Sequence, residues 1–518
     1  MIEHIVLVFD VGTQSSRACL INNYGQILGK SKLIHEPAYI SNHVDYAEIN
    51  PDYYYEKICE ASRNLKNEYP ELFAKIEAVS ITTIRDTLVC VDNEGKPLRD
   101  AILWLDKRKT DGEPNLNIPS KLILKGVSME KTAKEQYKKA HCNWIRENQP
   151  EIWKKTHKCL LISGYLIYKL TNNFTDAVPS MVGRIPMDAK TRTWMKKSGL
   201  TYPVFPVEKE KQYPLVEAGE TLGYITQQMS LDSYLPQGLK VIASGSDKAC
   251  EVIGMGCVDS DNIAIGLGTT ATISFTNYKY VEPEQFIPPY PSIIKGAYNP
   301  EIEIFRGYWL VSWFKKEFAL KEISESLNSN KSIEDLLNER LKEIPAGCDG
   351  LLFQPYFTPN ITMPNAHGAV IGFSDVHTRI HIYRSIIEGI NFALIDGFHI
   401  LQKRCKKQFK KIYIGGGASQ SDEICQITAD MFGLPVYRTE SFEATAIGCA
   451  VATFVGLGIF PNYKEAVDKM VTTRDCFQPN FEEHNIYHHL YHDVYKNIFK
   501  KLAPLYNNLQ NIYKHKKR

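Results

Sequence analysis

The chain has 518 residues, of which 44% are hydrophobic and 23% charged, a balance typical of globular proteins that fold in water. Its 61 basic and 59 acidic residues leave a formal charge of +2, so no charge-driven binding to nucleic acid or to an anionic membrane is expected. The length exceeds what one hydrophobic core supports, which predicts two or more domains. The twelve cysteines form no C-x-x-C pair, which favours reduced thiols and a cytoplasmic location.

The first predicted element is a hairpin in "VLVFDVGTQSSRACLI", with a polar turn between two apolar strands. No basic region or cleavage site precedes it, so no signal peptide is expected. The turn offers a carboxylate, a glycine, hydroxyls, an amide and a cation, namely Asp10, Gly12, Thr13, Gln14, Ser15, Ser16 and Arg17. This set suits a phosphate group with a hydrated metal ion beside it. An ordinary polar hairpin turn explains the same residues equally well.

The same pattern returns in the middle of the chain, in "NIAIGLGTTATISF" at residues 262–275. Gly268 stands where Gly12 stands in the first hairpin, 256 positions further on (268 − 12). Because the distance is about half the chain, the repeat predicts a duplicated α/β domain with a cleft between the two copies. The first domain is expected to span residues 1–255 and the second 256–518.

The segments between the two hairpins and after them alternate between strand and helix patterns. "AVSITTI" and "TLVCVD" are predicted strands, and "LKVIASG" and "KKIYIGGGA" are predicted strands that run into glycines. "EICQITADMFG" predicts an amphipathic helix that ends at Gly433, and "AIGCAVATFVGLGIF" a buried helix too short to cross a bilayer. The tail from about residue 485 predicts one helix, with its apolar face formed by Tyr487, Tyr491, Val494, Ile498 and Leu502.

A lone carboxylate, Asp247, follows a predicted strand and a Gly-Ser turn in "VIASGSDKACEVIGMG". Ligands bind at the carboxyl ends of strands in α/β folds, and a carboxylate there can accept the proton of an attacking hydroxyl during phosphoryl transfer. Taken alone, the same residue is explained as the N-cap of the helix that follows.

Three glycines follow a strand and precede a helix in "IYIGGGASQSDEICQI". Such a turn lets the backbone approach an anionic or flat ligand at a helix N-terminus. The chain contains neither G-x-x-x-x-G-K-[ST] nor G-x-G-x-x-G, so a P-loop and a dinucleotide fingerprint are not predicted.

Polar residues with a tryptophan gather in "TTIRDTLVCVDNEGKPLRDAILWLDKR". Arg85 and Asp86 together can hold a hydroxyl as donor and acceptor, and the Trp104 indole can flank the apolar face of a sugar. Asp106 and Arg108 follow two and four residues later. Surface ion pairs and a core tryptophan are the alternative explanation.

Together these motifs resemble the FGGY family of carbohydrate kinases, within the actin-like superfamily of duplicated ATPase domains. The resemblance rests on six segments that occur in the family's order between about residues 6 and 458: "FDVGTQSSRACLI", "TTIRDTLV", "AILWLDKR", "ASGSDKACEVIGMG", "IGLGTTATISF" and "IGGGASQSDEICQITADMFGLPVYRTESFEATAIGCAVA". It implies two actin-like (ribonuclease H-like) domains with a catalytic cleft between them, ATP and Mg²⁺ as cofactors, and a small sugar or polyol as the substrate. It leaves the oligomeric state open and allows a homodimer.

The resemblance also implies a role for each matched position. Asp247 corresponds to the catalytic base and Asp10 to the acid that organises Mg²⁺ through water. The first phosphate loop corresponds to Thr13, Gln14, Ser15, Ser16 and Arg17, and the second to Gly268, Thr269 and Thr270. The adenosine-binding turn corresponds to Gly416, Gly417 and Ala418, with Ser421 close to the nucleotide and Thr445 and Ala446 closing the pocket.

The substrate is less well defined by the sequence. Arg85 and Asp86 are similar to the Arg-Glu pair of glycerol kinases, and Trp104, Asp106 and Arg108 match a W-x-D-x-R common in the family. The chain departs from the glycerol kinase and xylulokinase patterns elsewhere, and Lys248 stands where glutamine is usual, which suggests a substrate with an extra polar or anionic group. Glycerol kinase, pentulose kinase, a kinase for another alcohol, and an actin-like ATPase without kinase activity remain as alternatives.

Overall fold

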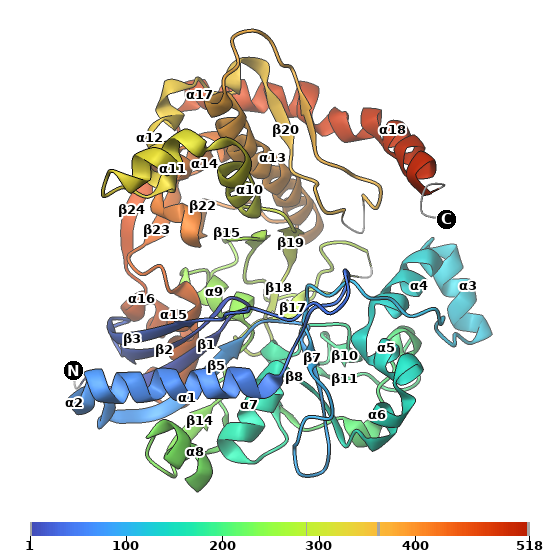
Figure 1. Cartoon of the computed structure of the whole chain (residues 1–518), viewed down its shortest axis with the longest axis vertical. Helices are drawn as coiled ribbons and strands as arrows, with labels where there is room; N and C mark the ends of the chain where they lie inside the picture. Colours follow the sequence, from blue (N-terminus) through green and yellow to red (C-terminus); the bar gives the residue numbers. More distant parts are fainter. Residues whose placement is uncertain (1–2, 286, 360–362, 515–518) are drawn as a thin grey trace.

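Each half of the chain builds one six-stranded mixed sheet, and the two halves lie one above the other in Figure 1. This computed structural model describes residues 3–285, 287–359 and 363–514. The first sheet has the order β13-β14-β5-β1-β2-β3. Its strands are β1 (Ile5–Val11), β2 (Ser15–Asn22), β3 (Ile27–Ile34), β5 (Ile76–Thr83), β13 (Thr221–Tyr224) and β14 (Lys240–Ile242).

The second sheet repeats the first strand by strand. Its order is β19-β16-β15-β22-β23-β24. These strands are β15 (Asn262–Leu267), β16 (Ala271–Ser274), β19 (Glu301–Ile304), β22 (Lys411–Gly415), β23 (Val436–Thr439) and β24 (Thr473–Phe477). In both sheets the opening strand, β1 or β15, pairs antiparallel with the second strand of its hairpin and parallel with a later strand, β5 or β22. That later strand pairs parallel with β14 or β23, which in turn pairs antiparallel with the edge strand, β13 or β24. The predicted duplication of an α/β domain is therefore confirmed.

Helices cover the sheets where the sequence has apolar faces. In the first half α1 (Pro51–Glu68) packs on β2 and β3, and in the second α13 (Arg379–Cys405) packs on β16 and β19. The predicted helix that ends at Gly433 is α14 (Asp422–Phe432), capped by the Ser421 side chain and closed by Gly433 at φ +64°. The other helices of the first half are α2 (Pro70–Phe73), α3 (Ile118–Gly126), α4 (Glu130–Lys139), α5 (His141–Asn148), α6 (Pro150–Lys155), α7 (Ile162–Thr171) and α8 (Gln227–Ser233). Those of the second are α10 (Trp309–Phe318), α11 (Leu320–Leu327), α12 (Ile333–Glu339), α16 (Tyr463–Met470), α17 (Phe481–His489) and α18 (Lys496–Lys514).

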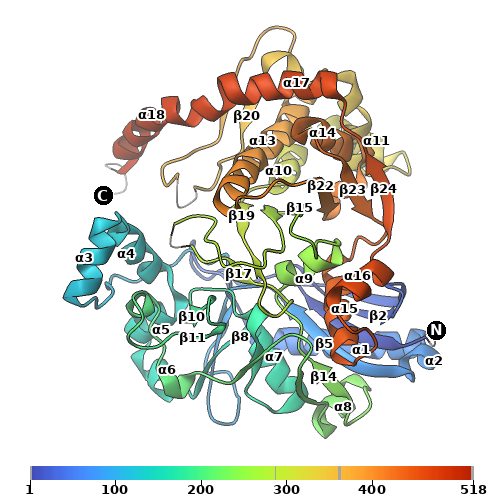
Figure 2. The same cartoon turned by 180° about the vertical axis from the view of Figure 1, so that it is seen from behind.

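Two helices join the halves. They are α9 (Asp247–Gly254) and α15 (Ala444–Gly456), which pack on each other, while α15 also lies on β1 and β5 of the first sheet (Figure 2). A Cβ at Gly254 would stand 1.8 Å from the Ala444 carbonyl oxygen, and one at Gly448 would stand 1.9 Å from that of Cys250. Only glycine permits so close an approach, so the small residues of "AIGCAVA" are explained by helix contact. The proposed boundary between residues 255 and 256 falls between α9 and β15.

The C-terminal tail differs in one respect from the single helix predicted. Between α17 and α18 the backbone forms a π-helical segment, Leu490–Tyr495. Because a π turn holds more residues than an α turn, the buried face shifts by one position. Tyr495 is therefore 1% exposed, while Val494, predicted to be on the apolar face, is 38% exposed.

Two further findings concern the cysteines and the length of the apolar helices. All twelve cysteines are free thiols. Within the described part of the chain, no helix is long and apolar enough to span a bilayer.

Candidate functional site

The first hairpin turn lies between β1 and β2 and is stabilised from below by a histidine. The Gly12 N–H donates to the Ser15 carbonyl at 2.9 Å. His35 places one ring nitrogen 2.9 Å from the Ser16 hydroxyl and the other 3.1 Å from the Thr13 carbonyl oxygen. Ser16 is fully buried against His35, whereas Gln14 is exposed at the tip of the turn. These contacts within the protein therefore hold the backbone of the turn.

Asp10, at the end of β1, lies in a chain of charges that reaches the second half. Its carboxylate accepts from Arg17 Nη1 at 2.8 Å, and Arg17 Nε stands 3.6 Å from Glu443, the residue before α15. Lys30 also contacts Glu443, at 2.9 Å. Burial raises the pKa of Asp10 to about 6, although the Arg17 guanidinium works against the rise.

The second hairpin turn, between β15 and β16, contains Gly268, Thr269 and Thr270 and occupies the position of the first turn in the repeated sheet. The carbonyl oxygen of Gly268 accepts from the Tyr308 N–H at 3.0 Å, and that of Thr269 from the Trp309 N–H at 3.3 Å. Trp309 is the first residue of α10, so this turn is tied to the start of that helix. Thr269 is exposed at the turn's tip.

The glycine-rich turn follows β22 and leads through a 3₁₀ turn, Gly417–Gln420, into α14. Gly416 has φ +90°, and a Cβ there would lie 2.8 Å from the Leu267 carbonyl group, whereas a Cβ at Gly417 would meet nothing within 4 Å. Ala418 packs against the core of the second half, and Ser421 caps α14. Thr445 and Ala446 lie in the first turn of α15, where Ala446 is fully buried.

Buried Arg438 supports that turn from beneath, a role the sequence did not indicate. Its Nη1 donates to the carbonyl oxygens of Ser419 and Gln420 at 2.9 and 3.1 Å. Its Nη2 pairs with Asp422 and Asp475 at 2.6 and 2.5 Å. The side chain therefore fixes the backbone that follows the glycines.

Asp247 is the first residue of α9, at the junction of the two halves. Ser246 caps this helix by accepting from the Ala249 N–H at 3.4 Å, so Asp247 is not the N-cap residue. The Asp247 carboxylate accepts from the Lys248 N–H at 2.8 Å and stands 3.9 Å from Arg85 Nε. Burial raises its pKa above the usual range of an aspartate, against the opposing effect of Arg85.

Arg85 bridges the two halves from the loop after β5. Its Nη1 donates to Glu301 at 2.7 Å, its Nη2 pairs with Glu303, and both acids come from β19 of the second half. Burial raises the pKa of Glu301. The pKa of Glu303 is lowered, because the attraction of Arg85 outweighs the effect of burial. The two neighbouring acids therefore share one proton more readily than two isolated acids would keep one. The guanidinium charge is thus balanced within the protein.

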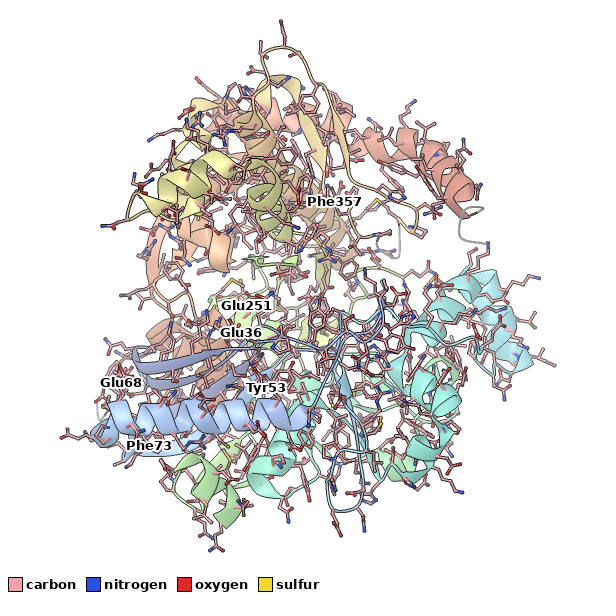
Figure 3. All side chains as sticks on the ribbon, in the orientation of Figure 1. Glu36, Tyr53, Glu68, Phe73, Glu251 and Phe357 are labelled. Carbon is pink, nitrogen blue, oxygen red and sulfur yellow. The ribbon has the colours of Figure 1, made fainter. Side chains whose placement is uncertain are left out.

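Lys248 is also paired, with Glu251 one turn along α9 at 2.5 Å. Burial works to lower the pKa of Lys248, but the carboxylates of Glu251 and Asp247 outweigh it. Figure 3 shows Glu251 at the level where the two halves meet. The charge of Lys248, which in the sequence suggested a substrate with an extra polar or anionic group, is therefore neutralised by Glu251.

Asp86 and Trp104 lie beside this junction. Asp86 has φ +47°; its carboxylate pairs with Arg184 and accepts from the Arg184 N–H at 2.9 Å. The Trp104 indole is 37% exposed and donates to the Thr13 hydroxyl at 2.9 Å, which ties it to the first hairpin turn.

Asp106 has a different position from its neighbours in the motif. Its side chain is fully buried; it accepts from the Ala47 N–H at 2.6 Å and pairs with Arg108 at 2.8 Å. The Arg108 guanidinium stacks over Tyr46 and Trp144. Both charges hold the segment after Trp104. The alternative of surface ion pairs and a core tryptophan is wrong for these residues, because the ion pair is buried and Trp104 is partly exposed.

Comparison with known proteins covers nearly the whole chain. Residues 5–254 match the N-terminal domain of the FGGY family of carbohydrate kinases and residues 263–457 match its C-terminal domain. The chain is 27% identical to the uncharacterized sugar kinase YgcE of Escherichia coli, over 92% of this chain and 90% of that protein. It is also 27% identical to a xylulose kinase of Bacillus subtilis, over 99% and 97%. A ligand-bound xylulose kinase of Lactobacillus acidophilus has the same fold, with a TM-score of 0.82 at 21% identity over 98% of this chain and all of the other.

Proposed function

Because the chain belongs to the FGGY family of carbohydrate kinases, we propose that Asp247 removes the proton from a hydroxyl of a small sugar or polyol as that hydroxyl attacks the γ-phosphorus of ATP. The supporting observation is the position of this carboxylate at the junction of the halves, 3.9 Å from Arg85 and in no closer ion pair within the described part of the chain. Burial raises its pKa, and a stronger base takes a proton more readily at neutral pH. The proton goes to the carboxylate as the new O–P bond forms and the bond to ADP breaks.

The two hairpin turns are proposed to bind the phosphates. Their tips, at Gln14 and Thr269, are exposed and lie at equivalent places in the two sheets, and both turns contain hydroxyl side chains. Thr13, Ser15, Gly268 and Thr270 complete these turns. Arg17 is proposed to add positive charge at the first turn, where Asp10 and Glu443 position it. Domain closure over the phosphates would exclude water from the reaction.

Mg²⁺ is proposed to be held at Asp10. No group of three or more metal-ligating side chains exists within residues 3–285, 287–359 and 363–514, so a closed cage of protein ligands is not built there. A single carboxylate, with waters and phosphate oxygens as the other ligands, is the way in which Mg²⁺ commonly binds. The buried Asp10 fits this role, and the ion would neutralise charge on the transferred phosphoryl group when bound.

The adenosine is proposed to lie against Gly416, Gly417 and Ala418, with Ser421 at the edge. The open space at Gly417 allows a flat ligand to approach the backbone, and Arg438 holds the following peptide groups in place. Thr445 and Ala446 close the other side.

The sugar is proposed to bind Arg85, Asp86 and Trp104, with Lys248 at the edge of the site. Asp106 and Arg108 act as positioning residues, because both are buried and hold the segment that carries Trp104. Relatives named xylulose kinase and gluconokinase, and a glycerol kinase with the same fold, indicate the range of acceptors to test. An actin-like ATPase without an acceptor is the second candidate, because the turns proposed to bind the nucleotide are separate from the residues proposed to bind the acceptor.

The test is a coupled assay of ADP release with Mg-ATP. Its acceptors are glycerol, erythritol, ribitol, xylitol, xylulose, ribulose and gluconate, with a reaction lacking any acceptor as the control. ADP release that depends on one acceptor, together with the phosphorylated product, supports the kinase. ADP release that is independent of every acceptor would support the ATPase alternative.

A further inference from the structure

A cluster of polar side chains beside Asp86 carries a positive charge without a partner. We call it the Arg184 cluster; it consists of Asp86, Gln136, Lys139, His141 and Arg184. Arg184 holds the cluster together, because its Nη1 pairs with Asp86 and its Nε lies 3.3 Å from the Gln136 amide oxygen. Arg184 and Asp86 balance each other in charge.

Lys139 supplies the surplus charge. It is the last residue of α4, three positions after Gln136, so both side chains lie on the helix face that meets Arg184. In the described structure no carboxylate lies within 4 Å of its half-buried ammonium group, while nearby Lys109 has its own partner, Glu135, at 3.0 Å. Burial, with repulsion by Arg184 and Lys109, lowers the pKa of Lys139, and the attraction of Glu135 offsets this only in part.

A purely structural explanation for Lys139 is the favourable interaction of a cation with the C-terminus of a helix. Lys138 provides that effect one residue earlier. It does not account for an ammonium group that is partly removed from water and repelled by the Arg184 guanidinium, an arrangement that costs free energy unless an anion joins it.

His141 provides a second and independent sign of a ligand. Its ring is 3% exposed, and the buried Nδ1 atom has no hydrogen-bond partner. Burial lowers the pKa of His141 to about 4, so the ring is neutral at pH 7. A buried polar atom without a partner is costly, and a ligand hydroxyl would satisfy a neutral imidazole nitrogen.

We propose that the acceptor is a sugar acid, with its carboxylate bound by Lys139 beside Arg184 and its hydroxyls bound by Asp86 and His141. The inference rests on the proposed kinase function and adds the chemical class of the acceptor. Asp86 is adjacent in the chain to Arg85, which lies 3.9 Å from Asp247, so the cluster adjoins the proposed base. One uncompensated cation matches the single charge of a carboxylate, whereas a phosphate on the sugar would bring nearly two.

The experiment compares the sugar acids erythronate, ribonate, xylonate and gluconate with the alditols and ketoses of equal carbon number and with the corresponding sugar phosphates. We expect one sugar acid to have a kcat/KM at least tenfold above that of its alditol. Lys139→Met is expected to raise the KM for that acid about 10- to 100-fold, as loss of a charged hydrogen bond does, and to leave the KM for ATP unchanged. Lys139→Arg keeps the charge and should retain most of the preference.

Lys138→Met is the matched control, because it removes the neighbouring cation and should leave the KM for the acid unchanged. If Lys139→Met folds poorly, the shift in the wild-type melting temperature with sugar acid against alditol gives the same comparison. Preference for an alditol, a ketose or a sugar phosphate, or an unchanged KM in Lys139→Met, would overturn the inference and leave the kinase intact. If no acceptor of any class yields a phosphorylated product, the kinase proposal fails and the inference with it.

Discussion

The substitution Asp247→Asn tests the proposed base with little change to the fold. The amide oxygen of the new side chain can still accept from the Lys248 N–H, which Asp247 binds at 2.8 Å. Ser246, which caps α9, is untouched. The lost attraction to Arg85 is small, because that contact is 3.9 Å long and Arg85 keeps both of its partners on β19. We expect the free energy of unfolding to change by no more than about 1 kcal/mol.

The effect on turnover should be much larger. A general base contributes roughly 10²- to 10⁴-fold to the rate, which corresponds to about 3 to 5 kcal/mol of activation free energy. Because an amide cannot take the proton, kcat for Asp247→Asn should fall by about that factor while nucleotide binding is retained. The pH profile gives a second signature. The wild-type rate should decline on the acid side at a pH above the usual aspartate range, since burial raises the pKa of Asp247. The variant should keep only the decline caused by protonation of Asp10, whose pKa is about 6.

The assay is acceptor-dependent ADP release, accompanied by a melting curve for each variant. Asp261→Asn is the matched control, since it makes the same chemical change at an exposed aspartate whose partner is Lys410, at 2.8 Å. It should retain full activity. Turnover within threefold of wild type in Asp247→Asn, with a normal melting temperature, would refute the assignment of the base.

Three other substitutions test the nucleotide and metal sites. Asp10→Asn should abolish turnover yet raise the free energy of unfolding at pH 7.5 by up to about 3 kcal/mol, because the pKa of Asp10 is about 6 in the folded protein against 3.8 for an ordinary aspartate, a difference of 2.2 units. The gain should shrink as the pH falls below about 6, where the native carboxyl is protonated. Melting curves at pH 7.5 and below pH 6 check it. Gly416→Ala should lower the melting temperature, because its Cβ meets Leu267, whereas Gly417→Ala should melt normally and only weaken ATP binding measured by calorimetry; equal melting losses in both would contradict this. Arg438→Met should cost about 3–5 kcal/mol and weaken ATP binding, whereas Arg474→Met, which removes a more exposed partner of Asp475, should change little in the same unfolding and binding measurements.

The parts of the fold that were predictable from sequence depend on local pattern. The two hairpins were predicted because an apolar strand, a glycine and a second apolar strand are contiguous in the chain. The repeated arrangement of β1, β2 and β3 in one sheet and of β15, β16 and β19 in the other follows from them. The end of α14 at Gly433 was predictable for the same reason, because the residues that end a helix are adjacent in the sequence. The π-helical segment in the tail was not, because it depends on how Tyr491 and Tyr495 pack against α13.

The candidate site was predictable only in part, because its supporting contacts join distant segments. Glu301 and Glu303 bind Arg85 across more than 200 residues of sequence. Nothing in the sequence around these two acids indicates that Arg85 is their partner. His35 supports the first turn from the end of β3, and Glu443 reaches Arg17 from the other half. None of these residues belongs to a motif that indicates its partner.

These unpredicted carboxylates change how the charges of the site are understood. From the sequence, Arg85 was predicted to bind a substrate hydroxyl and Lys248 to favour an extra polar or anionic group. In the structure, Glu301 with Glu303 neutralises Arg85, and Glu251 neutralises Lys248. A cation that is already paired can donate a hydrogen bond to a hydroxyl but adds little attraction for an anion. We therefore infer that discrimination between a neutral and an acidic acceptor depends on a charge without a partner, and Lys139 is the residue we propose for it.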